Sequence, residues 1–314
     1  MAEILKGAPV ASAITEELKT RCAALKEKDV FPTIAIVRVG ERPDDLAYER
    51  AAVKRLESIG IAVRQYVLDE KCDESEVIGA INEINIDSGI HGCLMFRPLP
   101  DRKAEIRASA RLVAEKDLDC MTGGSLAGVF AGNGEGFPPC TAQAVIELCD
   151  HYGIELEGRE VVVIGRSLVI GKPVSMLLLG RNATVTLCHT KTRNLAEVCH
   201  RADIIVAAAG RAGLVTEEFV SGRIHSYDNP DEAMEISTGH EQPTETPAWI
   251  NSASGQIVID VGINVTADGR LTGDVDFENV APRVAAITPV PGGVGSITTA
   301  VLAKHLIIAA EKTL

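Results

Sequence analysis

Strand and helix patterns alternate along almost the whole chain of 314 residues, and this order constrains the fold more than any other feature. Short apolar runs such as Thr33–Val39 and Gly92–Phe96 predict buried strands, and the stretch Leu46–Gly60 between them has a helical pattern. Such alternation is typical of α/β proteins with parallel sheets. We therefore predict an α/β fold, and the length predicts two domains.

A second series of the same kind begins at Glu160. The expected helices are Ile14–Glu27, Leu46–Gly60, Glu74–Ser88, 171–179, Leu195–Arg201 and Thr298–Lys312. The expected strands are Thr33–Val39, Ile61–Leu68, Gly92–Phe96, 160–164, Ala183–Cys188, Asp203–Ala208 and Gln256–Val261. Glycine and proline in Ala127–Pro139 predict a loop or linker. The polar, acidic stretch Glu217–Ser254 predicts an inserted surface loop near residues 218–254, either simply solvated or with a regulatory role.

Charge and cysteine content exclude several classes of protein. Lysine and arginine number 31 against 44 acidic residues, a net charge of −13 without a basic block, which argues against nucleic acid or an anionic membrane as partner. No apolar run reaches the roughly 18 residues of a membrane span, and no signal-peptide pattern is present, so we expect a cytoplasmic protein. The eight scattered cysteines contain no C-x-x-C pair, which predicts reduced thiols and no metal site.

The segment from Glu160 to Pro173 predicts a nucleotide site. Four apolar residues form a buried strand, Gly165 permits a tight turn, and Gly171 with Lys172 and Pro173 opens a helix. Backbone N–H groups and the positive helix end would together bind phosphate. The glycine spacing differs from the common G-x-G-x-x-G, so the prediction of a nucleotide site depends on the strand before the turn and the helix after it.

The residues after the next strand indicate which dinucleotide binds. NAD sites usually place Asp or Glu there to hold the ribose 2′-hydroxyl. Here Thr184–Cys188 is followed by His189, Thr190 and Lys191, and Arg166 and Ser167 lie in the glycine turn. Because Arg and hydroxyl groups suit a 2′-phosphate, the pattern favours NADP over NAD. The alternative is that Arg166 and Lys191 are ordinary solvated charges.

Four strings occur in order along the chain, namely Pro139–Thr141, Gly165–Pro173, Asp260–Asn264 and Thr288–Gly295. Together they resemble the methylenetetrahydrofolate dehydrogenase/methenyltetrahydrofolate cyclohydrolase family. The resemblance runs from about residue 4 to 312, apart from the insertion after Glu217. It implies a homodimeric tetrahydrofolate enzyme of one-carbon metabolism with folate in a cleft between two domains. The N-terminal α/β folate-facing domain would comprise residues 1–140 and 286–314, and the Rossmann-type NADP domain residues 141–285.

The resemblance also assigns roles to residues. Asp119 matches the family's pterin-binding aspartate, and Tyr48 would stack on or hydrogen-bond near the folate. Ile263 would contact the cofactor, and Pro291, Gly292 and Gly293 would let the backbone approach the substrate. Hydride transfer from the methylene bridge to nicotinamide needs no strong base, because the protein must mainly hold two rings face to face. The alternatives to these roles are structural. Tyr48 would then be a half-buried helix aromatic, Asp119 a carboxylate that caps a turn, and Gly292 and Gly293 part of a tight turn.

The chain departs from the family where the second activity, hydration of the methenyl product, requires proton transfer. The family's helix motif Tyr-x-x-x-Lys matches Tyr48 but places Ala52 at the lysine. Lys54 points to the opposite face, since two residues turn a helix by about 200°. Arg55 shares the face of Tyr48 but stays protonated. Phe96 replaces the glutamine that partners the lysine.

We therefore expect an NADP-dependent 5,10-methylenetetrahydrofolate dehydrogenase with weak or absent cyclohydrolase activity. One alternative is the bifunctional enzyme, a multifunctional protein with both oxidoreductase and hydrolase activity, in which another group replaces the lysine. A second alternative is a non-catalytic folate- or nucleotide-binding protein. Arg97 is expected either at the surface or at the glutamate tail of folate, and Asp45 and Glu49 are expected to be solvated helix charges.

Overall fold

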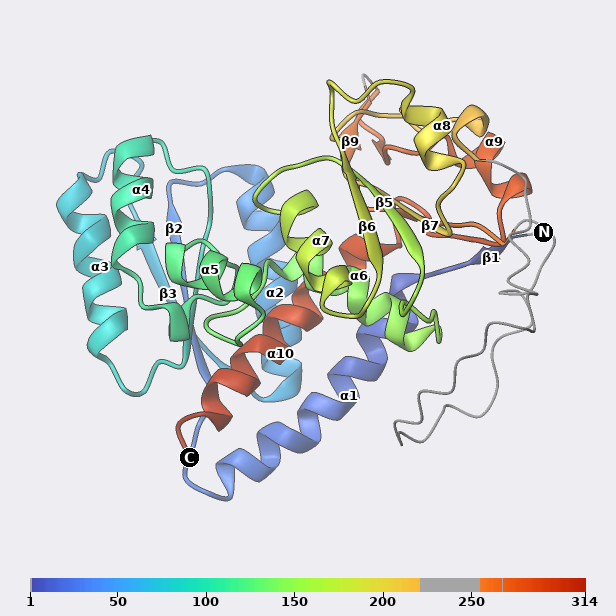
Figure 1. The fold of residues 1–314 in the computed structure, drawn as a ribbon. Coiled ribbons are helices and arrows are strands. Elements are labelled where there is room, and N and C mark those ends of the chain that lie inside the picture. The colour runs from blue at the N-terminus through green and yellow to red at the C-terminus, as the bar shows by residue number, and fades with distance from the viewer. Residues whose placement is uncertain (1, 221–254, 267) are drawn as a thin grey trace. The chain divides into compact units, whose positions relative to one another are not determined.

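The computed structural model describes residues 2–220, 255–266 and 268–314. The chain divides into two compact units (Figure 1). The large-sheet unit comprises Met1–Gly7 and Val145–Gly295, and the small-sheet unit comprises Ala8–Ala144 and Ser296–Leu314. One of the crossings between the units falls within helix α6 (Cys140–His151).

The small-sheet unit contains a parallel three-stranded sheet in the order β3-β2-β4. Its strands are β2 (Thr33–Val39), β3 (Ala62–Leu68) and β4 (Gly92–Met95). β2 is buried along its whole length, which explains its almost unbroken apolar run. The helices of the unit are α1 (Gly7–Lys26), α2 (Pro43–Ile59), α3 (Glu74–Ile86), α4 (Arg102–Arg111), α5 (Gly123–Ala131), the start of α6, and α10 (Thr298–Glu311).

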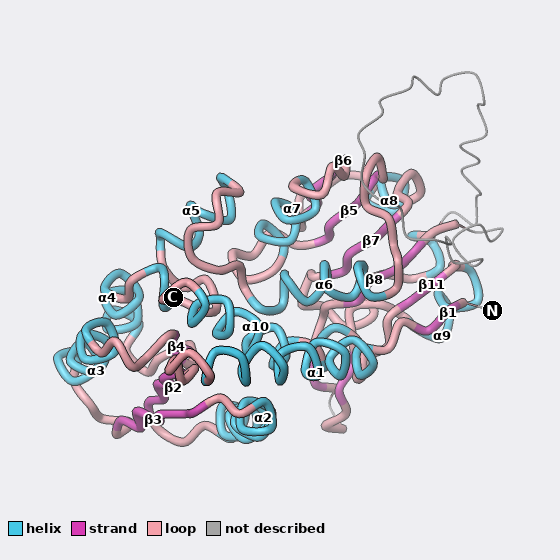
Figure 2. The backbone as a smooth tube through the Cα atoms, turned by 90° about the horizontal axis from the view of Figure 1, so that it is seen from below, coloured by secondary structure: helices cyan, strands magenta, loops and turns pink. Residues whose placement is uncertain are grey.

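Helices cover both faces of this sheet (Figures 1 and 2). α3 and α4 lie on one face, where Val77, Ile81 and Ala108 pack against Val37 and Met95 of the strands. α1, α2 and α10 lie on the other face. Polar contacts also join these three helices: the guanidinium of Arg55 in α2 donates to Thr15 Oγ1 of α1 and to Thr299 Oγ1 of α10, each at 2.8 Å.

The large-sheet unit is built on a parallel six-stranded sheet in the order β1-β11-β8-β7-β5-β6. Its strands are β1 (Glu3–Ile4), β5 (Glu160–Ile164), β6 (Thr184–Cys188), β7 (Ile204–Ala207), β8 (Ile257–Asp260) and β11 (Ala286–Ile287). A small hairpin adds β9 (Asn264–Val265) and β10 (Leu271–Thr272), and the helices are the rest of α6, α7 (Gly171–Leu179), α8 (Leu195–Cys199) and α9 (Phe277–Val280).

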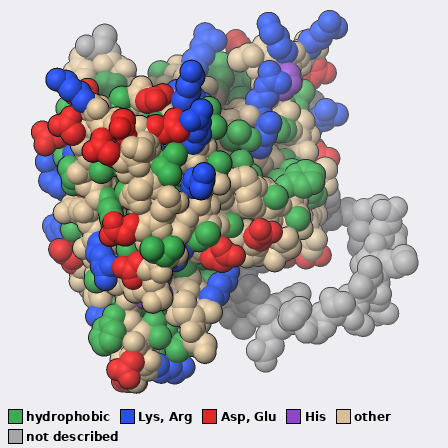
Figure 3. Space-filling view, turned by 90° about the vertical axis from the view of Figure 1, so that its left-hand side faces the viewer, with side chains coloured by type: hydrophobic (Ala, Val, Ile, Leu, Met, Phe, Trp, Pro, Cys, Tyr) green, Lys and Arg blue, Asp and Glu red, His purple; other side chains and the backbone are tan. Residues whose placement is uncertain are grey.

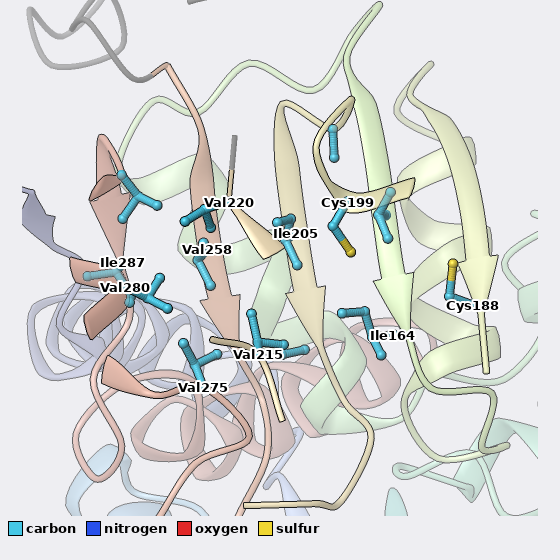
Figure 4. Packing of buried hydrophobic residues seen from close by; sticks show 14 residues of the cluster. Ile164, Cys188, Cys199, Ile205, Val215, Val220, Val258, Val275, Val280 and Ile287 are labelled. Carbon is cyan, nitrogen blue, oxygen red and sulfur yellow. The ribbon is translucent and has the colours of Figure 1, made fainter. Parts of the chain in front are cut away.

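The strand order places a topological switch at β5. The chain passes from β5 to β6 on one side and then to β7 on the other side of β5. In open parallel sheets, ligands bind outside the carboxyl ends of the strands at such a point. Figure 4 shows the core on one face of this sheet, where Ile164, Ile205 and Val258 meet Cys199 and Val280 from the covering segments.

Local sequence signals explain several helix boundaries. Pro43 opens α2, and Gly60 ends it with a φ of 95°, a left-handed conformation that glycine adopts at little cost. Asp73 and Glu76 form a capping box at the start of α3.

The predicted strands and helices are found within a few residues of their expected bounds, although α1 begins at Gly7 rather than Ile14.

The prediction of a loop over Ala127–Pro139 is wrong at its start, since α5 continues to Ala131. Two of its glycines, Gly128 and Gly136, serve close packing: a Cβ on Gly128 would lie 2.0 Å from the carbonyl oxygen of Glu135. Glycine there lets the returning chain lie directly against the helix. The sequence prediction also did not include α4, the hairpin, β1 or β11.

The observed division differs from the predicted domain bounds at three places, one of which is residues 141–144, assigned to the NADP domain but found in the small-sheet unit. Residues 1–7 and 286–295 were assigned to the folate-facing domain, but they belong to the large-sheet unit. Strand pairing is the reason, because β1 pairs with β11 and β11 pairs with β8. The predicted insertion near 218–254 lies, beyond Val220, outside the described residues.

All eight cysteines are free thiols. On the face drawn in Figure 3, acidic and basic side chains are interspersed among apolar ones. Within the described part of the chain, no helix combines the length and the apolar character that crossing a bilayer requires.

Candidate functional site

The turn between β5 and α7 fits its neighbours so closely that two positions require glycine. Gly165 has a φ of 127°, and a Cβ there would lie 2.0 Å from the carbonyl oxygen of Ala208. A Cβ on Gly171 would lie 1.9 Å from the carbonyl oxygen of Gly165. The turn, the start of α7 and the loop after β7 therefore form a backbone cradle at the carboxyl ends of β5 and β7.

The first turn of α7 offers few free N–H groups. Pro173 has none, and the N–H of Lys172 donates to the carbonyl oxygen of Ser167 at 3.1 Å. The hydroxyl of Ser167 accepts from the N–H of Ile170 at 3.0 Å, which fixes the turn. Among the described hydrogen bonds, the N–H of Gly171 remains for a phosphate.

The loop after β6 lies beside this turn, since Gly165 donates its N–H to the carbonyl oxygen of Cys188 at 2.9 Å. Nδ1 of His189 accepts from the N–H of Lys191 at 3.1 Å, and Thr192 Oγ1 accepts from the N–H of His189 at 2.9 Å. These bonds hold the loop in one shape. Thr190 and Lys191 are exposed, as is Arg166 in the adjacent turn, so hydroxyl and cationic groups are available to an anion.

Asp274 organises the third wall of the cradle, and the sequence analysis did not identify it. It is fully buried, and its carboxylate accepts the N–H groups of Ala209, Gly210 and Arg211 at 2.6–2.8 Å. It also accepts from the side-chain amide of Asn264 at 2.9 Å. One carboxylate thus fixes the whole loop after β7. No sequence signal marks Asp274, because its burial and its partners are set by the fold.

Asp260 has a similar role at the end of β8. Its carboxylate accepts the N–H groups of Gly262, Asp274 and Val275 at 2.9–3.0 Å. Burial raises the pKa of Asp260 to about 6, although these three hydrogen bonds act in the opposite direction. Ile263 follows on the exposed side of this bend, with 63% of its surface accessible.

The predicted segment Pro291–Gly293 also lies in the large-sheet unit. Gly292 has a φ of 101°, and its carbonyl oxygen accepts the N–H of Gly7 at 2.8 Å. A Cβ on Gly293 would lie 2.5 Å from the carbonyl oxygen of Pro289. A tight turn therefore accounts for these two glycines, while Pro291 and Gly292 remain exposed.

In the small-sheet unit, Tyr48 and Phe96 meet. Their rings pack edge to face with centroids 5.9 Å apart. Burial raises the pKa of the Tyr48 hydroxyl, which hydrogen-bonds to Thr298 at the start of α10. The phenol is therefore neutral at physiological pH and can act as a hydrogen-bonding group rather than a base.

Asp119 lies in the same unit with two different oxygen environments. Oδ1 accepts the N–H of Cys140 at 2.8 Å, and Oδ2 lies 3.9 Å from Nη2 of Arg97. Burial raises the pKa of Asp119, opposed by the Cys140 hydrogen bond and by Arg97. Asp117, which the sequence analysis did not single out, is buried and accepts the N–H groups of Met121 and Thr122, so it shapes the loop that carries Asp119.

The helix positions around Ala52 follow the predicted phase. Ala52 is fully buried. Lys54 lines a separate hollow of about 390 Å³ together with Arg50, Glu57 and Gln65. Arg55 faces α1 and α10 through the two hydrogen bonds given above. Neither cation therefore replaces a lysine at position 52.

The prediction that Asp45 and Glu49 are solvated is wrong. Both are buried, with 9% and 4% of their surface exposed. Glu49 pairs with Nε of Arg38 at 2.8 Å and accepts from Gln65 at 2.7 Å, so it is a buried, fully partnered charge. In the part of the chain that the structure describes, no cluster of His, Cys, Asp or Glu has the arrangement of a metal site.

Comparisons with known proteins assign both halves of the chain to one family. Residues 5–119 match the tetrahydrofolate dehydrogenase/cyclohydrolase catalytic domain. Residues 139–225 and 238–314 match the NAD(P)-binding domain of the same family. A relative named bifunctional protein FolD, from Carboxydothermus hydrogenoformans, is 48% identical over 99% of this chain and 98% of its own length.

Solved structures give the same result for the fold. The bifunctional enzyme FolD from Campylobacter jejuni, a methylenetetrahydrofolate dehydrogenase/cyclohydrolase, is 33% identical and aligns with a TM-score of 0.86 over 100% of both chains. The Trypanosoma brucei methylenetetrahydrofolate dehydrogenase-cyclohydrolase, complexed with NADP cofactor and inhibitor, is 29% identical with a TM-score of 0.82. That alignment covers 99% of this chain and 98% of the trypanosomal one.

Proposed function

Because the chain belongs to the tetrahydrofolate dehydrogenase/cyclohydrolase family, we propose that it is an NADP-dependent 5,10-methylenetetrahydrofolate dehydrogenase whose cyclohydrolase activity is weak or absent. The observation that carries the proposal is a contrast. The glycine cradle for a dinucleotide is intact, while buried Ala52 and half-buried Phe96 occupy the positions that resemble the family's lysine and glutamine.

The cofactor assignment rests on the cradle. Gly165 and Gly171 let the turn lie directly against neighbouring backbone, since a Cβ on either would lie 1.9–2.0 Å from a carbonyl oxygen, and Ser167 fixes the turn between them. We expect Gly171, Lys172 and Pro173 to lie against the pyrophosphate, and Arg166, Ser167, His189 and Thr190 to surround the 2′-phosphate. Exposed Ile263 would pack against the cofactor. When bound, NADP supplies the hydride acceptor.

The substrate assignment rests on residues of the small-sheet unit. Ionised Asp119 would accept hydrogen bonds from the donor-rich pterin ring, with its carboxylate held at Oδ1 by the N–H of Cys140. Tyr48, held by Phe96 and Thr298, would stack on or hydrogen-bond to the folate. Pro291, Gly292 and Gly293 are proposed to contribute backbone contacts to the substrate. None of these residues must remove a proton for hydride transfer to proceed.

The bifunctional enzyme is the second candidate, and the names of the relatives favour it. The local geometry supports the first candidate instead. Hydration of the methenyl cation releases a proton, and an apolar Ala52 offers no group to accept it. Arg55 is a poor base, and the hydroxyls of Thr15 and Thr299 already accept from it.

Two assays on the purified protein separate the candidates. One follows NADPH formation from 5,10-methylenetetrahydrofolate, and the other follows loss of added methenyltetrahydrofolate above its spontaneous rate. NADPH formation without accelerated loss supports the proposal. Accelerated loss would show the bifunctional enzyme, and no activity in either assay would indicate a binding protein.

A gain-of-function variant tests the same assignment more directly. We expect Ala52→Lys combined with Phe96→Gln to accelerate loss of methenyltetrahydrofolate, with NADPH formation retained. Lys54→Ala is the matched control, because Lys54 lies on the other face of α2 and should affect neither reaction.

We also expect a homodimer, which light scattering after gel filtration would detect.

A further inference from the structure

Arg97 is a cation that the dehydrogenase proposal leaves without a role. It directly follows Phe96 at the end of β4, and 27% of its side chain is exposed. Its Nη2 lies 3.9 Å from Oδ2 of Asp119, the carboxylate proposed to hold the pterin. The two residues come from different loops of the small-sheet unit, so the fold brings them together.

The two oxygens of Asp119 have separate partners. Oδ1 is taken by the N–H of Cys140, which fixes the orientation of the carboxylate. Oδ2 faces Arg97, at a distance that leaves room for a ligand donor on the same oxygen. With 32% of its side chain exposed, the carboxylate is accessible to a ligand.

The other groups that face Asp119 do not supply positive charge. Asp117 and Cys120 lie on its own loop, Cys140 begins α6, and Tyr48 projects from α2. His305 of α10 contacts the neighbouring carbonyl oxygen of Leu118 through Nδ1 at 2.9 Å. Among the described groups that interact with Asp119, Arg97 is the cation.

We propose that Arg97 is the counter-ion of Asp119: a positioning residue that keeps the pterin-binding carboxylate ionised. The proposal rests on the proposed function. A guanidinium 3.9 Å from the carboxylate suits this role through its charge, since it stays protonated. For the same reason it cannot replace a lysine that exchanges protons.

The test compares wild type with Arg97→Met, which removes the charge and retains bulk, and Arg97→Lys, which retains the charge. For Arg97→Met we expect the KM for methylenetetrahydrofolate to rise, by up to about tenfold, and more at pH 6 than at pH 8.5. The acid limb of the 1/KM profile should move up by about one pH unit, because a nearby cation lowers a carboxyl pKa by that order. The KM for NADP should not change, and Arg97→Lys should restore the profile.

The double variant with Asp119→Asn tests whether Arg97 acts through Asp119. In that background, Arg97→Met should have almost no further effect. Arg102→Met is the matched control, since Arg102 is exposed and pairs with Glu105 at 3.4 Å instead. An unshifted acid limb in Arg97→Met, or an undiminished effect in the double variant, overturns the proposal.

Binding of tetrahydrofolate, measured by calorimetry at the same two pH values, separates this proposal from the dehydrogenase assignment. If wild type binds tetrahydrofolate but forms no NADPH, the assignment fails and the Arg97 comparison still proceeds by binding. Tetrahydropteroate, which lacks the glutamate tail, gives a second discrimination. A loss of affinity in Arg97→Met that persists with this ligand supports the counter-ion. A loss that disappears shows that Arg97 contacts the tail and overturns it.

Discussion

The two sets of proposed ligand-binding residues are built in different ways. In the large-sheet unit, the cofactor turn is made of backbone, and its shape depends on side chains that are absent at Gly165 and Gly171. In the small-sheet unit, the substrate residues are side chains from separate segments, namely Tyr48, Phe96, Arg97 and Asp119. A backbone site tolerates no added atom, whereas a side-chain site can exchange one group for another. Under the proposed function, that difference accounts for an intact cofactor turn beside altered substrate residues.

The largest effect is expected from Gly165→Ala. The added Cβ would lie 2.0 Å from the carbonyl oxygen of Ala208, in a backbone conformation with φ of 127°. We expect a loss of about 4 kcal/mol in unfolding free energy and no measurable NADP binding. Thermal unfolding and fluorescence titration would measure both. Gly210→Ala, at a φ of 65° with open space around it, should cost only about 1 kcal/mol.

Asp274→Asn tests whether a buried side chain is as important to the backbone site as its glycines. An amide cannot accept the three N–H groups of the loop after β7 as a carboxylate does. We expect a loss of about 3 kcal/mol in unfolding free energy, together with a raised KM for NADP. Exposed Asp268→Asn is the control. Unchanged NADP binding would show that the loop holds its shape without Asp274.

Asp260 gives a pH dependence that belongs to the large-sheet unit. Its pKa is about 6 in the folded protein against 3.8 as the ordinary value, so the folded state binds more protons between these values. Stability contributed by the protonated group is present at pH 4 and is lost as the pH rises through 6, by about 2 kcal/mol. Urea unfolding of wild type and Asp260→Asn from pH 4 to 7 measures this. A difference between the two proteins that stays constant with pH would contradict it.

The smallest effect is expected from Arg166→Ala. Arg166 is exposed, so its loss should leave stability unchanged. If it binds the 2′-phosphate, affinity for NADP should fall about tenfold, or about 1.4 kcal/mol, with little change for NAD. Equal weakening of both cofactors would assign Arg166 to the pyrophosphate instead. The same measurement of NADP and NAD affinity on Lys191→Ala would show whether the loop after β6 contacts the 2′-phosphate.

Sequence reasoning found what depends on short-range pattern. The strand Thr33–Val39 was predicted with its observed bounds, because a buried central strand is a continuous apolar run. The phase of α2 was also predictable, since Ala52 and Lys54 differ by a fixed rotation. Prediction from sequence failed where tertiary packing, rather than the local residue pattern, decides the position of a residue. Gly128 and Gly136 serve contact between α5 and its return loop, and Glu49 is buried because Arg38 pairs with it from β2.

By itself, the sequence determined the α/β class, the glycine turn after β5 and the family to which the chain belongs. Each depends on residues close together in the chain, or on strings that match as they stand. The tertiary structure decided that residues 1–7 complete the large sheet, that Asp274 holds the loop after β7, and that Arg97 faces Asp119. Those contacts join residues distant in sequence, and a side chain's partner is set by packing, which local pattern does not encode.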